Sequence, residues 1–321
     1  MIEILSGGAL NLVQDTGRKG YMKLGISPGG AMDSMALSLA NLLLGNPESS
    51  AVIEINIFPF RITFLSDTCF ACTGGNSVIK LDDNIVAPWW RKMASNGQVL
   101  IIERPRNGTR VYLAFAGGID VPHILGSAST DLKCAMGGVD GRGLKRGDIL
   151  RLKPSSHAQQ KKSLGVIPKG LSEFWREATS GQVKIKVLPG AEYHEFTAEA
   201  LHQFCHYSYV ITPQSNRLGY RLKGHPLTFS QKKELLSHGI VPGTIQVPPD
   251  GQPIIQLADA NTCGGYPKIG TIIESDLWKV AQCPVGCQLR FEFIGLDEAI
   301  ADLKRFNTHY TTLKNTLHLY S

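Results

Sequence analysis

Residues 239–268 read GIVPGTIQVPPDGQPIIQLADANTCGGYPK, and the rest of the chain is organised around this stretch. It contains two runs with strand character, Thr244–Val247 and Ile254–Leu257, on either side of the turn sequence Pro248–Gly251. Proline presets a negative φ, aspartate caps the turn with its own carboxylate, and glycine accepts a positive φ. The stretch therefore predicts a β-hairpin.

A polar loop, Asn261–Tyr266, follows the predicted hairpin and contains almost no hydrophobic side chain. Its two adjacent glycines let backbone N–H groups approach a ligand or another chain closely. Glycine-rich turns are also common in ordinary β-proteins, so a purely structural role fits the same residues. The hairpin would hold Gln246, Gln256 and Asp259 near this loop.

Short segments of alternating hydrophobicity dominate the rest of the chain. Glycine, asparagine and aspartate turns separate them, which is typical of barrels and sandwiches rather than of a parallel α/β sheet. Other stretches carry apolar residues at helical spacing. We therefore predict a mainly β fold with a few helices. The predicted strands include 61–65, 77–81, 110–115 and 183–187, and the predicted helices are 31–44, 171–178, 197–206 and a C-terminal helix.

Length and internal similarity indicate two β-rich domains. A chain of 321 residues fits two domains of ordinary size. Both halves open with an alternating strand and a glycine turn, and both close on similar stretches. Between them the chain is polar and punctuated by proline and glycine. We predict an N-terminal domain at 1–153, a connector at 154–182, a C-terminal domain at 183–295 and an amphipathic helix at 296–321.

Composition argues against several classes of protein. Hydrophobic content of 43% and charged content of 19% are typical of a globular chain. The net charge of +6 is too diffuse to indicate a nucleic-acid partner. The N-terminus lacks a signal-peptide pattern, and no apolar run approaches the length of a membrane span. Seven scattered cysteines, an odd number, favour a reducing cytoplasm over a disulfide framework.

The general signatures of catalysis and metal binding are mostly missing. The chain has no P-loop, no G-x-S-x-G elbow and no H-E-x-x-H. Cys69 and Cys72 have the spacing of a zinc knuckle, but in a predicted strand residues three apart face opposite sides. Lys92-Met93 follows Arg91, so the Met-Lys-Met pattern of a biotin-carrying lysine is not met. We predict neither a metal site nor covalently attached biotin.

The stretch from Ser27 to Asp33 places Gly29 and Gly30 just before a predicted helix. Free N–H groups at a helix start favour a carboxylate or phosphate. An ordinary loop that leads into the helix, with Asp33 in the first turn, explains the same residues. Both interpretations stay open at this point.

Two further residues carry chemistry that a site would need. Arg217, in the polar stretch Pro213–Tyr220, can hold a carboxylate bidentately or form a structural salt bridge. His238, just ahead of the hairpin, has a pKa suited to proton transfer, although a lone histidine is more often structural.

The candidate site combines these stretches. Spacing does not show which of the candidate carboxylates converge; these are Asp33, Glu54, Asp131, Asp250 and Asp259. As catalytic residues we predict His238 and Asp33. As substrate- or nucleotide-binding residues we predict Gly29, Gly30, Ser215, Asn216, Arg217, Tyr220, Gln246, Asp250, Asp259, Gly264, Gly265, Tyr266 and Lys268.

Many ordered motifs, spread over about residues 2–293, resemble one protein family. Its members are described as biotin-dependent carboxyltransferase, allophanate hydrolase subunit 2 or KipA-like proteins. LPGAEYHEF, SNRLGYRL and ELLSHG are most similar to the branch formed by the C subunits of 5-oxoprolinase. The other motifs are VQDTGRKGY, SPGGAMD, LANLLLGN, AGGIDVP, GSASTDLK, LLSHGIVPGTIQVPPDGQPI and TCGGYPKI.

This resemblance implies two cyclophilin-like β-barrel domains and a hetero-oligomer that also contains the KipI-like B and the A subunits of 5-oxoprolinase. Such an assembly hydrolyses the lactam of the small molecule 5-oxo-L-proline to L-glutamate with ATP, expected as Mg-ATP. A lactam amide is inert, so activation of its oxygen by ATP makes chemical sense. The chain departs from the expected Thr-Thr-Gly-Gly-Tyr-Pro loop at Cys263, which removes the second hydroxyl.

Two alternative functions remain open. One is a carboxyltransferase-like protein that acts on urea or a related amide. The other is a non-catalytic KipA-type regulator that binds a KipI-like kinase inhibitor. The ELLSHG and EYHEF stretches favour the 5-oxoprolinase interpretation.

Overall fold

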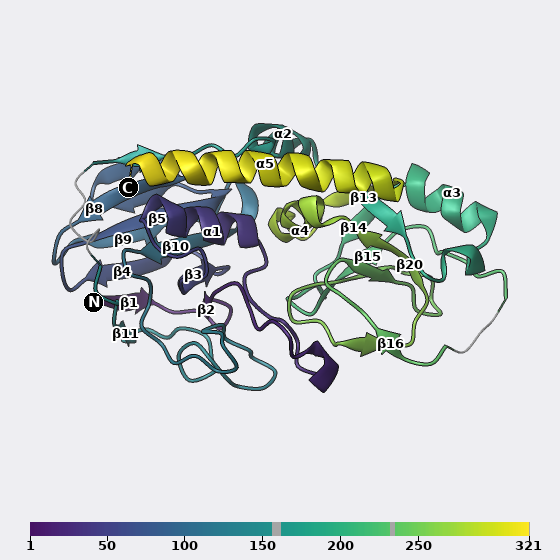
Figure 1. Ribbon diagram of the computed structural model, residues 1–321, viewed down its shortest axis with the longest axis horizontal. Coiled ribbons are helices and arrows are strands. Elements are labelled where there is room, and N and C mark those ends of the chain that lie inside the picture. Colours follow the sequence, from purple (N-terminus) through teal and green to yellow (C-terminus); the bar gives the residue numbers. More distant parts are fainter. Residues whose placement is uncertain (156–161, 232–234, 321) are drawn as a thin grey trace. The chain divides into compact units, whose positions relative to one another are not determined.

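The protein is mainly β. The computed structural model describes residues 1–155, 162–231 and 235–320. Strands predominate in these ranges, which also contain five α-helices (Figure 1). Within the same ranges, no helix combines the length and the apolar character that a membrane span requires. The predicted fold class is confirmed.

Contacts within the chain divide it into two compact units, and neither unit is continuous in sequence. The first unit comprises Met1–Lys19, Gly29–Lys169 and Tyr310–Ser321. The second comprises Gly20–Pro28 and Gly170–His309. The domain boundaries set from composition stay a prediction.

Two six-stranded antiparallel sheets build the first unit. Their strand orders are β11-β1-β4-β9-β6-β7 and β12-β8-β5-β10-β3-β2. Buried residues of both sheets share one hydrophobic core, to which alternate positions of β4 contribute Phe60, Ile62 and Phe64. The strands are β1 (Ile2–Ser6), β2 (Leu12–Gln14), β3 (Val52–Ile55), β4 (Phe60–Phe64), β5 (Thr68–Asn76), β6 (Ile79–Leu81), β7 (Asn84–Val86), β8 (Trp90–Ala94), β9 (Val99–Ile102), β10 (Asn107–Phe115), β11 (Ile149–Leu150) and β12 (Leu164–Gly165).

Helix α1, Ser34–Leu43, packs against β5 and β10 of the first unit. Asp33 caps it, because its Oδ1 accepts a hydrogen bond from the backbone N–H of Ala36 at 2.9 Å. The helix ends at Leu43 with Leu44 as its C-cap, and Gly45 follows with a φ of 70°, which a residue without a Cβ adopts readily. The helix predicted at 31–44 is therefore confirmed, with a start three residues later.

A closed barrel of seven strands forms the centre of the second unit, in the order β13-β20-β17-β18-β15-β14-β21. Strands β13 and β21 pair in parallel, and the other neighbours pair antiparallel. Along β13 the apolar residues Val183, Ile185 and Val187 point inward and are buried. The strands are β13 (Gln182–Pro189), β14 (Tyr209–Ile211), β15 (Gly219–Lys223), β17 (Thr244–Gln246), β18 (Ile254–Gln256), β20 (Lys268–Ile272) and β21 (Gln288–Phe293).

The predicted hairpin is strands β17 and β18. Ile245 lies opposite Ile255, and both are fully buried in the barrel. In the turn, the N–H of Gly251 donates to the carbonyl of Pro248 at 2.9 Å, and Gly251 has a φ of 75°. This is the proline-to-glycine turn that the sequence predicts, so the hairpin is confirmed.

Helix α5, Leu296–Tyr320, is the predicted C-terminal helix. In the second unit, Lys186 of β13 forms ion pairs with Glu298 at 2.7 Å and with Asp302 at 2.9 Å. These pairs attach the first turns of the helix to the barrel. The remaining helices are α2 (Leu171–Ser180), α3 (Ala198–His206), α4 (Leu277–Gln282) and the 3₁₀ turns η1 (Met22–Leu24), η2 (Tyr193–Glu195) and η3 (Glu274–Asp276).

Candidate functional site

A cavity of about 290 Å³ lies on the outer face of the barrel, over β15, β18 and β17. Tyr220 and Ile255 point into the barrel and are buried, so their neighbours along each strand face outward. This alternation brings Arg221 and Gln256 to the cavity. Its lining residues are Gln214, Asn216, Leu218, Gly219, Arg221, Ile240, Gln246, Ile254, Gln256, Asn261, Cys263, Gly264, Gly265 and Tyr266.

A two-stranded ribbon, β16 (His238–Gly239) and β19 (Cys263–Gly264), contributes to the cavity wall. Gly264 lies so close to Gln246 that a Cβ at this position would come within 2.4 Å of the Gln246 Nε2. A Cβ on Gly265 would likewise meet the carbonyl of Leu235 at 3.0 Å. The glycine pair is therefore required for close packing, and it also lines the cavity as the sequence predicts.

Carboxamide side chains dominate the cavity lining. Gln256 donates from Nε2 to the Oε1 of Gln246 at 2.8 Å. Gln246 is only 4% exposed, and among the described residues its own Nε2 has no hydrogen-bond partner. Amides offer donors and acceptors without charge, so the lining suits a polar, largely neutral ligand. The members of this amide set are Gln214, Asn216, Gln246, Gln256 and Asn261.

Arg221 is the one lining residue that carries a formal charge. Its backbone is held in place, because the Oγ of Ser215 accepts from the Arg221 N–H at 3.0 Å and the N–H of Thr212 donates to the Arg221 carbonyl at 2.9 Å. In the described part of the chain no carboxylate forms an ion pair with its guanidinium. The cavity therefore combines neutral amides with a single cationic side chain on a backbone that is held in place.

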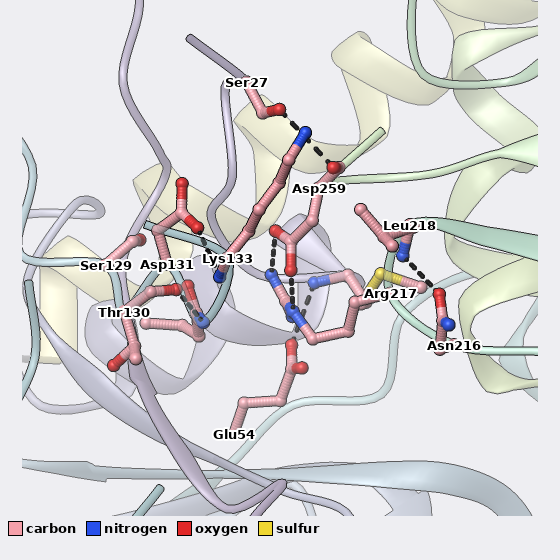
Figure 2. Close-up of polar contacts among 12 residues, drawn as sticks. Ser27, Glu54, Ser129, Thr130, Asp131, Lys133, Asn216, Arg217, Leu218 and Asp259 are labelled. Atoms are coloured by element: carbon pink, nitrogen blue, oxygen red, sulfur yellow. Dashed lines mark hydrogen bonds and ion pairs between the residues drawn. The ribbon is translucent and has the colours of Figure 1, made fainter. Parts of the chain in front are cut away.

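Arg217, the predicted ligand-binding arginine, is engaged by Asp259 instead. Its Nε and Nη2 donate to the two carboxylate oxygens at 2.7 and 2.9 Å (Figure 2). The side chain is only 6% exposed, and Arg217 is not among the residues that line the cavity. The structure thus shows the structural salt bridge that the sequence left open, because the pair ties two loops of the second unit together.

Lys268, His238 and Glu192 form a polar cluster behind the ribbon. The Nζ of Lys268 lies 3.1 Å from the Nδ1 of His238 and donates to the Gly264 carbonyl at 3.0 Å. The Nε2 of His238 lies 3.4 Å from Glu192, which also accepts from the Lys268 backbone N–H. Burial lowers the pKa of Lys268. The cluster places an amine, an imidazole and a carboxylate next to the cavity wall.

The predicted anion site at the start of α1 is filled by the protein's own carboxylates. Met32 donates its N–H to Glu54 at 2.9 Å, and Asp33 caps the helix. The hydroxyl of Tyr112 accepts from the Asp33 N–H and donates to Glu54, both at 2.8 Å. Gly30, with a φ of 83°, allows the chain to pass close to residues 16 and 17. Asp33 therefore acts as a structural cap here.

Other predicted site residues also hold the fold together. Tyr220 lies inside the barrel, on the face of β15 away from the cavity. Asp250 accepts from the Gln252 N–H at 3.1 Å within the hairpin turn. Asp131 accepts from the backbone N–H groups of Lys133 and Cys134 (Figure 2). None of these three residues lines the cavity. Of the predicted binding residues, the cavity brings together Asn216, Gln246, Gly264, Gly265 and Tyr266.

The two spaced cysteines lie in β5 and are buried. Burial raises the pKa of Cys69 to about 11 and raises that of Cys72 further, which disfavours the thiolate that zinc requires. Among the residues that the structure describes, no three His, Cys, Asp or Glu side chains gather closely enough to hold a metal ion.

Sequence reasoning missed Arg221 and Glu192. For Arg221 a signal was present in the alternation of the strand. Neighbouring residues of a strand face opposite sides, so Tyr220 and Arg221 could not both line the same site. For Glu192 the stretch EYHEF gave only a family resemblance. Its distance in sequence from Lys268 and His238 hides the contact that the barrel creates.

Comparisons with known proteins agree on the family. Residues 24–293 match the family described as carboxyltransferase domain, subdomain A and B. The chain is 42% identical to the C subunit of 5-oxoprolinase from Escherichia coli over 322 residues, which covers 99% of each chain. It is 38% identical to the corresponding 5-oxoprolinase protein of Haemophilus influenzae, over 97% of this chain and 96% of the relative.

A solved structure supports the same relationship. The crystal structure of Kluyveromyces lactis urea amidolyase superimposes with a TM-score of 0.86 and 28% identity, over 97% of this chain and 20% of that much longer one. The sequence profile, the full-length relatives and the shared fold thus point the same way. The chain belongs to the carboxyltransferase domain family, subdomain A and B, in which its motifs and full-length relatives place it beside the C subunits of 5-oxoprolinase.

Proposed function

We propose that this chain is the C subunit of an ATP-dependent 5-oxoprolinase. In this role it acts with the KipI-like B and the A subunits of the enzyme to hydrolyse the lactam of 5-oxo-L-proline to L-glutamate. The observation that carries the proposal is the end-to-end similarity, at 42% identity, to a protein named as the C subunit of 5-oxoprolinase. The amide-lined cavity supports it, because a lactam needs hydrogen-bond partners more than it needs charge.

The size and lining of the cavity favour a small ligand over ATP. Its volume of about 290 Å³ lies at the lower end of the roughly 300–1,000 Å³ typical of small-molecule sites. A triphosphate also calls for several cationic or N–H donors, and the lining offers one guanidinium. We therefore assign ATP to the cytoplasmic assembly as a co-substrate and the small amide to this cavity.

Reconstitution tests the proposal. The purified chain, combined with its B and A partners, should release glutamate from 5-oxo-L-proline when ATP is present. Omission of ATP, or of any one of the three proteins, should abolish the release. A complete, stably assembled complex that releases no glutamate would contradict the proposal.

Urea carboxylation is the second candidate, because the carboxyltransferase family and the urea amidolyase fold both point to it. It predicts transfer of a carboxyl group from a biotinylated carrier to urea or a related amide. The same purified chain tests it, with and without such a carrier. Tight binding to a KipI-like partner with no turnover of either substrate would instead indicate a regulator.

A further inference from the structure

The charge pattern of the cavity is asymmetric. Arg221 lies on the outward face of β15, and the other lining residues are uncharged. Within the described residues its guanidinium has no carboxylate partner, whereas the guanidinium of Arg217 is held by Asp259. A single cation among neutral amides favours a ligand with one anionic group, and a planar guanidinium matches a carboxylate in particular.

Two glutamines of the cavity lining, Gln246 and Gln256, are hydrogen-bonded to each other. Gln256 donates once to Gln246, which uses one donor and one acceptor. The Nε2 of Gln246 is shielded by the chain, whereas the half-buried Gln256 keeps its second amide N–H and its carbonyl oxygen without a partner among the described residues. One donor next to one acceptor is the complement of the C=O and N–H of a lactam.

We propose that this cavity is a binding site for a small cyclic amide that carries a carboxylate. Arg221 binds the carboxylate, and Gln256, held in place by its hydrogen bond to Gln246, recognises the ring amide. The inference rests on the proposed function and deepens it, since 5-oxo-L-proline belongs to this class. It also moves the carboxylate anchor from Arg217 to Arg221.

Calorimetric titration of the full-length chain with three probes tests the inference. 5-Oxo-L-proline has both groups, 2-pyrrolidinone lacks the carboxylate, and L-proline lacks the lactam carbonyl. We expect 5-oxo-L-proline to bind more tightly than either of the others. Arg221→Gln should lower the affinity for 5-oxo-L-proline by about tenfold or more and leave the affinity for 2-pyrrolidinone unchanged. Gln256→Leu should weaken the binding of both lactams.

Lys223→Gln is the matched control, because Lys223 lies on the same face of β15 but does not line the cavity. It should bind 5-oxo-L-proline like the wild type. The proposed site would be overturned if wild type and Arg221→Gln bound 5-oxo-L-proline with equal affinity. It would also be overturned if the wild-type chain did not bind 5-oxo-L-proline. Binding by the chain without turnover by the assembly would overturn the proposed function and leave the site in place.

Discussion

The loop before α1 and the cavity over the barrel both gather glycines and polar groups, but they differ in what their hydrogen-bonding groups contact. At the helix start, Glu54 accepts from Met32, and Asp33 accepts from Ala36. In the cavity, the carbonyl oxygen and the second N–H of Gln256 have no partner within the described residues, and no described carboxylate pairs with Arg221. The first region is a completed structural motif, and the second offers its groups to a ligand.

Glu54→Ala should have the largest effect on stability, because it removes the centre of the completed motif. The carboxylate is fully buried, accepts from the Tyr112 hydroxyl at 2.8 Å and lies 3.9 Å from the Nε of Arg110. Loss of one member of a buried charge pair costs about 3–5 kcal/mol. Urea denaturation should show a decrease of this size in the free energy of unfolding.

Glu54→Gln is the control for shape, since it keeps one oxygen acceptor in the same space. It should lose less stability than Glu54→Ala. If Glu54→Ala were as stable as the wild type, the helix start would not depend on this carboxylate, and the contrast between the two regions would fail.

Arg217→Ala should have the next largest effect on stability, and it should distinguish Arg217 from Arg221. Its buried bidentate pair with Asp259 predicts a loss of about 3 kcal/mol in the free energy of unfolding. Arg221→Ala, at an exposed strand position, should change stability by less than about 0.5 kcal/mol. The reverse order of stabilities would show that Arg217, and not Arg221, is the arginine available to a ligand.

Gly264→Ala should disturb the cavity more than the fold. The new Cβ would lie 2.4 Å from the Nε2 of Gln246, so the glutamine must shift, at a cost of about 1–3 kcal/mol. Affinity for 5-oxo-L-proline should fall accordingly.

Gly239→Ala is a matched control on the facing strand of the ribbon. Gly239 pairs with Cys263, and a Cβ there would meet nothing within 4 Å. It should bind and unfold like the wild type. Equal binding by the two alanine variants would remove Gln246 from the site.

The hairpin and α1 could be predicted from sequence because local chemistry specifies them. The turn Pro248–Gly251 and the apolar spacing of α1 act within a few residues of each other. The site could be predicted only in part. The stretch that contains Arg217 was found, but its partner Asp259 lies 42 residues away, so the sequence could not show that this arginine is engaged. Whether a polar group is satisfied is a property of the folded chain.

Lys268→Met should have the smallest effect on stability, and its distinguishing feature is a dependence on pH. Lys268 resembles Glu54 in being buried, yet it contacts the wall of the cavity through the Gly264 carbonyl. Burial lowers its pKa below the ordinary 10.5. Between the folded and unfolded pKa values the unfolded chain binds more protons, so the free energy of unfolding rises with pH across that window.

Lys268→Met removes the contribution of Lys268 to this rise in the free energy of unfolding. The other titrating groups remain in both proteins. The free energy of unfolding of the wild type minus that of Lys268→Met should therefore increase as pH rises toward about 10. Urea denaturation at a series of alkaline pH values measures it. A difference that falls with pH would mean that Glu192 stabilises the charged amine more than burial destabilises it. Lys268 would then belong with the completed ion pairs of the molecule and not with the groups available near the cavity.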